Sequence, residues 1–452
     1  MSARIHDLVG IGIGPFGLGL AALAEPLADV DAVFLDRAPE FRWHPGMMIE
    51  GATIQVPFLA DLVTLADPTS PYSFLAYLKH IGRLYPFYVR ESFYPLRTEY
   101  DDYCRWVADQ LDSLRWGRRV VSVQEEADHL LVTAEVLDPS GEVSGLEEHR
   151  ARHVVLGIGT APALPRALAE LAQSAPGEHR VLHSCDYLSH RAQLREAGSV
   201  TIVGSGQSAA EIYRDLLEDA GARGTRVDWV TRSPRFFPME YTKLTLELTS
   251  PEHTALFRSL PESRREQLGR EQRSLYKGIS GDLVDEIHDL LYRLSSGGRE
   301  VPSTLLTGTA VTAARHDAAT GELVLTLEHE LLGTTAEHRT HAVVSATGYR
   351  ARGTDLLAPL GESIRRDSRG RLDVAAEDYT VDTARRVHVM NAEEHSHGLT
   401  APDLGFGPWR AGVILAAITG REPYPLERRT AFQTFGLPGD VPVQTPPQQE
   451  HA

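Results

Sequence analysis

The segment from Asp7 to Gly19 constrains the fold of this 452-residue chain more than any other. An apolar run leads into Gly12, Gly14 and Gly17, which fit the pattern G-x-G-x-x-G, and an Ala/Leu-rich run follows. This order predicts a strand, a tight turn and a helix, where the glycines allow the turn, the approach of a pyrophosphate and the packing of helix on strand. Phosphates then lie at the helix N-terminus, because its free N–H groups and its dipole favour negative charge.

An acid follows this motif at the expected distance. A second apolar strand, 32–35, ends in Asp36, nineteen residues after Gly17. An acid at this place typically binds an adenosine ribose hydroxyl. The alternative is a glycine turn in an unrelated α/β protein, and Asp36 makes that the weaker interpretation.

A second copy of the same device lies near the middle of the chain. The β-branched run 199–203 leads into Gly204 and Gly206, which fit G-x-G-x-x-A at the start of a predicted helix. The next strand, 227–231, ends in Arg232 instead of an acid, and an arginine there suits the 2′-phosphate of NADP. The alternative for Arg232 is a solvated cation at a strand end. One acidic and one basic site favour FAD at the first motif and NADPH at the second.

Composition excludes several other classes of protein. The formal net charge of −17 argues against nucleic acid or an anionic membrane as a partner. Cys104 and Cys185 are the only cysteines, which excludes a disulfide scaffold and a cysteine-rich metal site. The histidines do not combine with acids at metal-ligand spacing, so no metal is expected. No window reaches transmembrane length and no leader pattern is visible, so we expect a cytoplasmic protein.

The chain order indicates domains that interleave. Buried strands that end in small residues, 154–162 and 343–350, mark the points where the chain leaves the first domain and returns to it. The predicted fold class is α/β, with two Rossmann-like dinucleotide-binding domains, for FAD and NADPH, and a smaller helical substrate-binding insertion. The expected boundaries are 1–165 and 346–435 for the FAD domain, 166–345 for the NADPH domain, about 236–298 for the helical insertion, and 436–452 for a Pro/Gln-rich disordered tail.

Taken together, the motifs resemble those of the flavin-dependent N-hydroxylating monooxygenases that act on lysine, ornithine or aliphatic diamines in siderophore biosynthesis. The resemblance covers nearly the whole chain and is carried by Gly14-Pro15-Phe16, Trp43-His44-Pro45-Gly46-Met47, Phe58-Leu59-Ala60-Asp61-Leu62, Gly204-Ser205-Gly206-Gln207-Ser208-Ala209, Ala346-Thr347-Gly348-Tyr349 and His397-Gly398-Leu399. It implies FAD, NADPH and O₂ as co-substrate, and oxidation of an amine nitrogen to a hydroxylamine through a flavin C4a-hydroperoxide.

In such enzymes the cofactor performs the chemistry, so no residue is predicted with certainty to be catalytic. The resemblance places Gln55 and Trp43 near the flavin and Arg97 in the active site, with Gln55 and Arg97 as supporting residues. The alternatives are that Trp43 belongs to the core and that Arg97 is a helix-start cation. The implied cofactor-binding residues are Gly12, Gly14, Pro15, Phe16, Gly17, Asp36, Trp43, His44, Gln55, Gly204, Gly206, Gln207, Ser208, Arg232, Thr347, Gly348 and Tyr349.

The substrate positions depart from the ornithine pattern. Ala60 stands where ornithine enzymes carry a lysine that pairs with the substrate carboxylate, and Met239 and Leu275 align with substrate-binding asparagines. Gly405, beside Leu404, aligns with a serine. Losing a charge-assisted bond of about 1.5–3 kcal/mol disfavours amino acids. The resemblance therefore implies a diamine substrate, cadaverine or putrescine, with lysine as the alternative and ornithine less favoured.

Two other classes share the predicted architecture. A two-dinucleotide flavoprotein reductase that exchanges disulfides needs a Cys-x-x-Cys or similar pair near the flavin, and the sequence has none. A flavin-bound sensor or binding module would not need the second nucleotide motif. We expect an enzyme with a small-molecule substrate that assembles as a homodimer or homotetramer.

Overall fold

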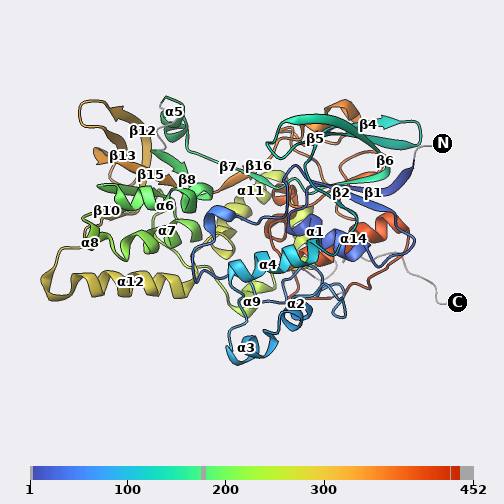
Figure 1. The fold of residues 1–452 in the computed structure, drawn as a ribbon, viewed down its shortest axis with the longest axis horizontal. Coiled ribbons are helices and arrows are strands. Elements are labelled where there is room, and N and C mark those ends of the chain that lie inside the picture. Colours follow the sequence, from blue (N-terminus) through green and yellow to red (C-terminus); the bar gives the residue numbers. More distant parts are fainter. Residues whose placement is uncertain (1–3, 175–179, 428, 438–452) are drawn as a thin grey trace.

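The computed structural model describes residues 4–174, 180–427 and 429–437. Two lobes lie side by side, each built around its own sheet (Figure 1). The first lobe contains both ends of the described chain, and the second lobe contains its middle. This arrangement agrees with the predicted α/β class.

The sheet of the first lobe has the order β3-β2-β1-β6-β5-β4, and β17 also pairs with β6. Strand β6 connects the antiparallel and the parallel part of this sheet. Its first part pairs antiparallel with β5, and its last part pairs parallel with β1. The antiparallel strands β4 and β5 therefore extend the nucleotide-type sheet. The strands are β1 (Ile5–Ile11), β2 (Ala32–Leu35), β3 (Leu114–Arg115), β4 (Arg118–Glu126), β5 (His129–Leu137), β6 (Val143–Leu156) and β17 (Val387–Val389).

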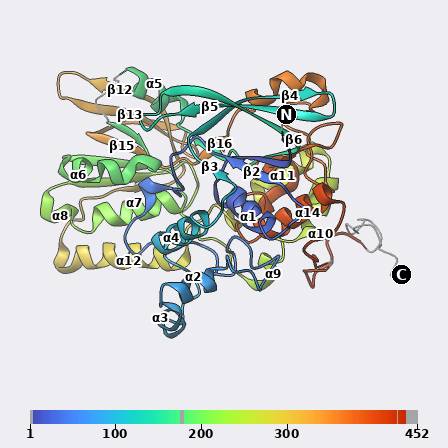
Figure 2. The same cartoon turned by 45° about the vertical axis from the view of Figure 1, so that its right-hand side comes forward.

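Helices cover this sheet on the side that carries the glycine turn. Helix α1 (Pro15–Ala24) is buried from Gly17 to its end and packs beside α14 (Gly407–Thr419). Helix α4 (Arg97–Ala108) packs against α1, and α2 (Phe74–His80) and α3 (Leu84–Val89) project beyond it (Figure 2). The carboxyl ends of β1 and β2 thus meet the N-terminus of α1 at one edge of the sheet.

The sheet of the second lobe is parallel throughout, with the order β11-β10-β9-β15-β8. An antiparallel sheet, β12-β13-β14, packs against α5 beside it. The strands are β8 (Val181–His183), β9 (Ser199–Val203), β10 (Arg226–Val230), β11 (Leu305–Leu306), β12 (Thr309–Asp317), β13 (Glu322–His329), β14 (Thr334–Thr340) and β15 (Ala342–Ser345). The helices are α5 (Arg166–Ser174), α6 (Tyr187–Glu196), α7 (Gln207–Leu217) and α8 (Ala220–Arg223).

The two segments that connect the sheet of the first lobe with the sheet of the second lobe pair with each other. Strand β7 (Thr160–Pro162) runs antiparallel to β16 (Tyr349–Ala351), with Ala161 opposite Arg350. The segments predicted to carry the chain out of the first domain and back are therefore joined by backbone hydrogen bonds.

The segment expected as the helical insertion packs against both lobes. Its last helix, α12 (Gly281–Ser295), packs on α7 and contributes Ile287 and Leu290 to the core of the second lobe. The preceding helices α10 (Pro251–Ser259) and α11 (Glu262–Glu271) instead contact the first lobe at α13 (Glu394–His397). The short helix α9 (Lys243–Leu246) precedes them.

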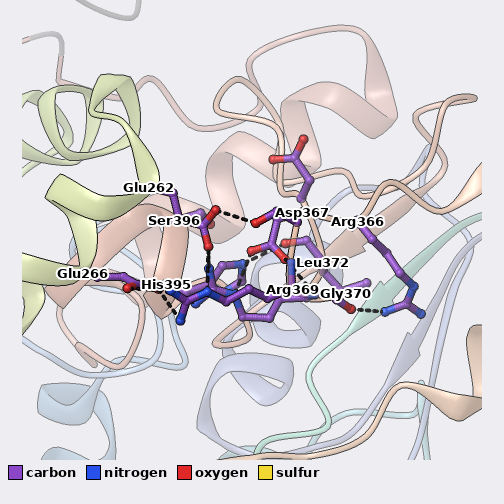
Figure 3. A network of polar contacts seen from close by, with 12 residues as sticks. Glu262, Glu266, Arg366, Asp367, Arg369, Gly370, Leu372, His395 and Ser396 are labelled. Atoms are coloured by element: carbon purple, nitrogen blue, oxygen red, sulfur yellow. Dashed lines mark hydrogen bonds and ion pairs between the residues drawn. The ribbon is translucent and has the colours of Figure 1, made fainter.

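A polar network fixes α11 to the first lobe (Figure 3). Glu262 and Glu266 of α11 form ion pairs with Arg369, at 3.2 and 2.6 Å, and Glu262 also pairs with Arg371 at 2.8 Å. The ring of His395 lies in the same network and its Nε2 donates to the carbonyl of Leu372. The helical segment is therefore held against the first lobe by charge, while α12 is held in the second lobe by apolar packing.

Three further expectations concern the C-terminal tail, membrane-spanning helices and metal-binding groups. The predicted tail lies, from residue 438 onward, outside the described residues. Within the described ranges, no helix is both long and apolar enough to cross a membrane. The same part of the chain contains no group of three or more His, Cys, Asp or Glu side chains placed to hold a metal ion.

Candidate active site

The glycines of the first turn have different physical roles. Gly12 has a φ of 100°, and a Cβ there would lie 2.3 Å from the carbonyl oxygen of Gly157. A Cβ at Gly17 would lie 2.0 Å from the carbonyl oxygen of Gly12. By contrast, no atom outside the immediate chain neighbours lies within 4 Å of a Cβ built on Gly14. Gly14 is the N-cap residue of α1, and no side chain accepts a hydrogen bond from the N–H groups at this helix end. Gly14 therefore leaves open space before an uncapped helix N-terminus, and this suits a pyrophosphate.

Asp36 lies beside this turn. Its Oδ2 accepts a hydrogen bond from the backbone N–H of Ile13 at 2.7 Å, and its Oδ1 accepts from the N–H of Ala38 at 2.8 Å. A carboxylate has about four acceptor positions, so capacity remains for a ribose hydroxyl. The residue has the predicted place, and its contact with the ribose stays a prediction.

Pro15 and Phe16 begin α1 next to a buried cation. The guanidinium of Arg410 lies 4.6 Å from the centre of the Phe16 ring and forms an ion pair with Glu393. Both charged side chains are fully buried, and Nε and Nη2 of Arg410 have no hydrogen-bond partner among the described residues. Buried donors without acceptors are costly, so a bound polar group here would be favourable.

An aromatic cluster connects the first lobe to strand β16. The centre of the Trp43 ring lies 5.1 Å from that of Tyr100 and 5.3 Å from that of His44. The His44 ring in turn packs edge-on against Tyr349, with 5.7 Å between the ring centres. The His44 side chain is accessible to solvent, yet desolvation by surrounding atoms, together with the charge of Arg97, lowers its pKa to about 4. His44 is therefore a neutral, aromatic wall residue near pH 7.

The crossing motif itself is fixed by hydrogen bonds. The Thr347 hydroxyl donates to the carbonyl of Ala163 at 2.6 Å, and the Gly348 carbonyl accepts from Nε2 of His183 at 2.9 Å. These bonds place Thr347, Gly348 and Tyr349 at the junction of the lobes. The junction is where a ligand bound to one lobe comes within reach of the other.

Gln55 shows the clearest sign of a missing partner. Its Nε2 is buried and makes no hydrogen bond to any residue that the structure describes. Its backbone carbonyl is fixed by the Tyr241 hydroxyl at 2.8 Å. A flavin carbonyl or ring nitrogen would satisfy the free amide donor, so the residue fits its predicted place beside FAD.

The second glycine turn has the same division of roles. Gly204 has a φ of 146°, and a Cβ there would lie 2.3 Å from the Ala346 carbonyl oxygen. Gly206 is the N-cap of α7, again without a side-chain cap, and a Cβ there would meet only the Lys277 carbonyl oxygen at 3.5 Å. Gly204 is therefore required by the backbone. Gly206, followed by Gln207 and Ser208, leaves room for a phosphate before the uncapped N-terminus of α7, and that role stays a prediction.

Arg232 lies next to this second turn. It follows β10 and is exposed, and the neighbouring Ser233 hydroxyl donates to the Ser205 hydroxyl within the turn at 2.9 Å. No ion pair of Arg232 occurs among the described residues. The guanidinium is thus available beside the glycine turn, as binding to a 2′-phosphate requires, and that role stays a prediction.

Arg97 joins the two lobes. Its guanidinium forms two hydrogen bonds of 2.7 Å to the Glu211 carboxylate of α7 and a third, of 3.2 Å, to the Met47 carbonyl. Glu211 also accepts from Nε2 of Gln207 at 2.8 Å, and Oε1 of Gln207 accepts from the N–H of Ser280 at 2.8 Å. Both side chains predicted to serve the cofactors, Arg97 and Gln207, are therefore engaged within the protein. Their direct contact with a cofactor stays a prediction.

The structure brings Ala60 and Gly405 together. A Cβ on Gly405 would lie 3.4 Å from the Ala60 methyl carbon, 3.8 Å from Cδ1 of Leu65 and 3.1 Å from Oδ1 of Asp403. Ala60 is buried, and Leu404 packs against the first core. Two positions chosen from sequence alone, 345 residues apart, thus share one small space.

Met239 and Leu275 lie in the helical segment, between α8 and α12. The backbone N–H of Met239 donates to Ile279 at 2.8 Å, and that of Glu240 donates to Ser274, next to Leu275, at 3.4 Å. Tyr241, two residues after Met239, reaches the Gln55 loop through its hydroxyl. The segment that carries both apolar positions therefore contacts the loop of Gln55, the residue assigned to the flavin.

Sequence reasoning missed three residues of this site. Glu211 is the buried partner of Arg97, Tyr241 connects the helical segment to Gln55, and Asp403 lies beside Gly405. Asp403 stands two residues before a position that the resemblance did identify. Single polar residues in irregular segments carry no periodicity, so no sequence pattern marked them.

The cysteines do not form a redox site. Cys104 is buried in α4 and Cys185 is partly buried in the second lobe, and both are free thiols. Burial raises the pKa of Cys104 well above its usual range, which makes this thiol unreactive. The structure thus gives no support to the disulfide reductase alternative.

Comparison with known proteins agrees with this geometry. Residues 4–351 match the family model of L-lysine 6-monooxygenase/L-ornithine 5-monooxygenase. The putrescine N-hydroxylase of Shewanella oneidensis is 44% identical over 95% of this chain and 84% of its own length. The crystal structure of the cadaverine monooxygenase DfoA of Erwinia amylovora, bound to FAD, superposes with a TM-score of 0.91 at 44% identity, covering 97% of this chain and 100% of that one.

A structure with both nucleotides is also similar. The ornithine N-hydroxylase of Kutzneria sp. 744, with reduced FAD, NADP⁺ and L-ornithine, has a TM-score of 0.82 at 26% identity, covering 92% of this chain and 99% of that one. The family model and the full-length relatives lead to one conclusion, in agreement with the two glycine turns. The chain belongs to the L-lysine 6-monooxygenase/L-ornithine 5-monooxygenase family.

Proposed function

We propose that this protein is an FAD- and NADPH-dependent monooxygenase that hydroxylates one primary amine of an aliphatic diamine, cadaverine or putrescine. The product hydroxylamine would supply hydroxamate siderophore biosynthesis. The observation that carries the substrate class is the contact of Ala60 with the Gly405 position, because neither residue offers a partner for a carboxylate. The relatives named for putrescine and cadaverine support the same class.

FAD would bind the first lobe and NADPH the second, with the boundaries near residues 165 and 345. Gly14 and the α1 N-terminus would hold the FAD pyrophosphate, Asp36 its ribose, and Gln55 the flavin ring. Gly206 and Arg232 would hold NADPH. Once bound, FAD reduced by NADPH activates O₂, so that one oxygen atom joins the amine nitrogen and the other leaves as water.

The protein must present a neutral amine to this chemistry. An alkylammonium has a reference pKa of about 10.4, so deprotonating it near pH 7 costs about 4–5 kcal/mol. Desolvation lowers the pKa of an amine. The buried side chains of Ala60 and Met239, with the partly buried Leu275, supply an apolar surround that favours the neutral form.

The test is a product assay. The purified enzyme, loaded with FAD, receives NADPH and O₂ with putrescine, cadaverine, L-lysine or L-ornithine, and the hydroxylamine formed is quantified. We expect product from at least one diamine and little from either amino acid. Product from lysine exceeding that from both diamines would overturn the diamine assignment and leave the N-monooxygenase family membership intact.

We further propose a cytoplasmic, homo-oligomeric enzyme. NADPH is a cytoplasmic reductant, and free thiols such as Cys104 and Cys185 are typical of a reducing compartment. Light scattering coupled to size-exclusion chromatography measures the molar mass of the particle in solution. A mass of 49.8 kDa, that of one chain, would contradict the proposed homo-oligomer.

A further inference from the structure

We propose that the carboxylate of Asp403 binds the far ammonium of the diamine, the end that is not oxidised. This inference rests on the proposed diamine activity and names the group that selects the substrate. Asp403 lies in the irregular segment between α13 and α14, immediately beside the space shared by Ala60 and Gly405.

The local geometry holds the Asp403 carboxylate in place without giving it a cation partner. Oδ1 of Asp403 accepts from the backbone N–H of Phe406 at 2.9 Å, and it lies 3.1 Å from where a Cβ on Gly405 would be. The carboxylate also accepts from the backbone N–H of Gly405, and no ion pair joins it to a cation among the residues of the described ranges. A glycine at 405 therefore makes room for the carboxylate, which is oriented by two backbone N–H groups and keeps acceptor positions for a ligand.

The neighbouring carboxylates are already engaged, in contrast to Asp403. Asp61, next to Ala60, accepts four hydrogen bonds, from the N–H groups of Val63, Thr64 and Phe74 and from the Thr64 hydroxyl. Two acids of the segment before Asp403 have cation partners: Glu393 pairs with Arg410, and Glu394 pairs with Lys277. In the part of the chain that the structure describes, Asp403 thus has neither a cation partner, as Glu393 and Glu394 have, nor the four hydrogen bonds that Asp61 accepts.

An acid in these surroundings favours a cationic ligand. Desolvation raises the pKa of Asp403, because the surrounding atoms disfavour its negative charge, while its bonds from Phe406 and Gly405 and the charge of Arg410 oppose that effect. Asp403 is nevertheless partly exposed, so a ligand can reach its carboxylate. An ammonium bound there would supply a counter-ion and favour the ionised form.

The position relative to the flavin residues is also suitable. Asp403 lies close enough to Tyr241 for its charge to contribute to the raised pKa of that hydroxyl, after desolvation and Tyr94. Tyr241 in turn donates to the carbonyl of Gln55, the residue whose side-chain amide lacks a partner. A linear diamine can therefore extend from the flavin side of the site, at Gln55, to its far end at Asp403.

The same group would reject amino acids. The far end of lysine carries a carboxylate next to its ammonium, and the carboxylate would face Asp403 without a cation from position 60. Like charges in a poorly solvated site repel, so Asp403 favours the diamine and disfavours lysine at once. The site thus has the opposite charge preference from one that holds an α-carboxylate through a lysine.

The test compares diamines with monoamines. Wild-type enzyme and Asp403→Asn are assayed for hydroxylamine from putrescine and n-butylamine, and from cadaverine and n-pentylamine. Asparagine keeps an oxygen for the Phe406 N–H, so the turn is preserved and only the charge is removed. We expect kcat/KM for the diamines to fall at least tenfold, mainly through KM, and that for the monoamines to change by less than threefold.

A matched control separates this effect from the loss of a surface charge. Asp138 also caps a turn, through Ser140 and Glu142, in the exposed hairpin between β5 and β6. Asp138→Asn removes the same charge and should leave the diamine-to-monoamine ratio unchanged. FAD content and substrate-free NADPH oxidation report whether each variant is folded.

The outcomes are distinguishable. Equal losses for diamines and monoamines in Asp403→Asn, or no loss for either, would overturn the role of Asp403. If that variant does not retain FAD, the wild-type enzyme alone decides, because equal kcat/KM for putrescine and n-butylamine would show that no group binds the far ammonium. A wild-type enzyme that oxidises lysine but neither diamine would instead overturn the proposed function.

Discussion

Replacing Ala60 with lysine tests how charge selects the substrate. The Ala60 methyl carbon lies beside the Gly405 position, and Asp403 Oδ1 lies on the other side of the same space. A lysine introduced at 60 is therefore long enough to reach the Asp403 carboxylate. Its ammonium would pair with the Asp403 carboxylate, the group that we assign to the far ammonium of the diamine.

The size of the effect follows from the interaction that is lost. A charge-assisted contact contributes about 1.5–3 kcal/mol, which corresponds to about a 10- to 150-fold decrease in kcat/KM for putrescine and cadaverine. Lysine should gain little from Ala60→Lys alone, because the new cation is neutralised by Asp403. Combining Ala60→Lys with Asp403→Asn frees that cation for an α-carboxylate, so only the double variant should improve lysine turnover, by roughly tenfold or more.

The assay is hydroxylamine formation from each substrate, with FAD content measured for every variant. Ala60→Met is the matched control, since it adds similar length without charge and reports the steric part of the effect. Equal losses in Ala60→Met and Ala60→Lys would show that bulk, not charge, governs position 60. Improved lysine turnover by Ala60→Lys alone, with diamine turnover unchanged, would refute the pairing with Asp403.

Two further predictions concern the cofactors. Gly14→Ala should purify without FAD because its methyl group would enter the open space before α1, whereas Gly206→Ala should retain FAD and lose reduction by NADPH, which the flavin absorbance reports. The reverse pattern would overturn the order of the two sites. Arg232→Ala should raise the KM for NADPH about tenfold and change the KM for NADH less than twofold, and equal increases for both would show that Arg232 does not bind the 2′-phosphate.

The nucleotide-binding elements were predictable because their chemistry is local. A glycine motif needs only a strand before it and a helix after it, and both turns have this form, at Gly12 and at Gly204. In the structure, Gly12 and Gly204 have a positive φ, and a Cβ at either position would clash with backbone atoms. A Cβ on Gly14 would enter open space, and one on Gly206 would lie at ordinary contact distance from the Lys277 carbonyl oxygen. Variants of Gly204 would therefore strain the fold, so Gly206 is the informative position in the second site.

The arrangement of the helical segment was not predictable in the same way. Its helices share a charged, amphipathic composition, yet α12 enters the second core through Ile287 and Leu290, while α11 binds the first lobe through Glu262 and Glu266. The partner of each face lies more than 60 residues away along the chain. Amphipathicity identifies which face is buried and does not identify what buries it.

The substrate site illustrates the same limit and a way past it. Resemblance located Ala60 and Gly405 by what they lack, a cation and a hydroxyl, and this predicted only that an amino acid is disfavoured. The structure shows what the smaller side chains make room for, since a side chain at 405 would crowd the Asp403 carboxylate at 3.1 Å and the Ala60 methyl at 3.4 Å. In our interpretation the three positions act as one unit, in which loss of a cation at 60 and a small residue at 405 leave an acid free to bind an ammonium. Specificity for a diamine then results from attraction as well as from the loss of the carboxylate partner.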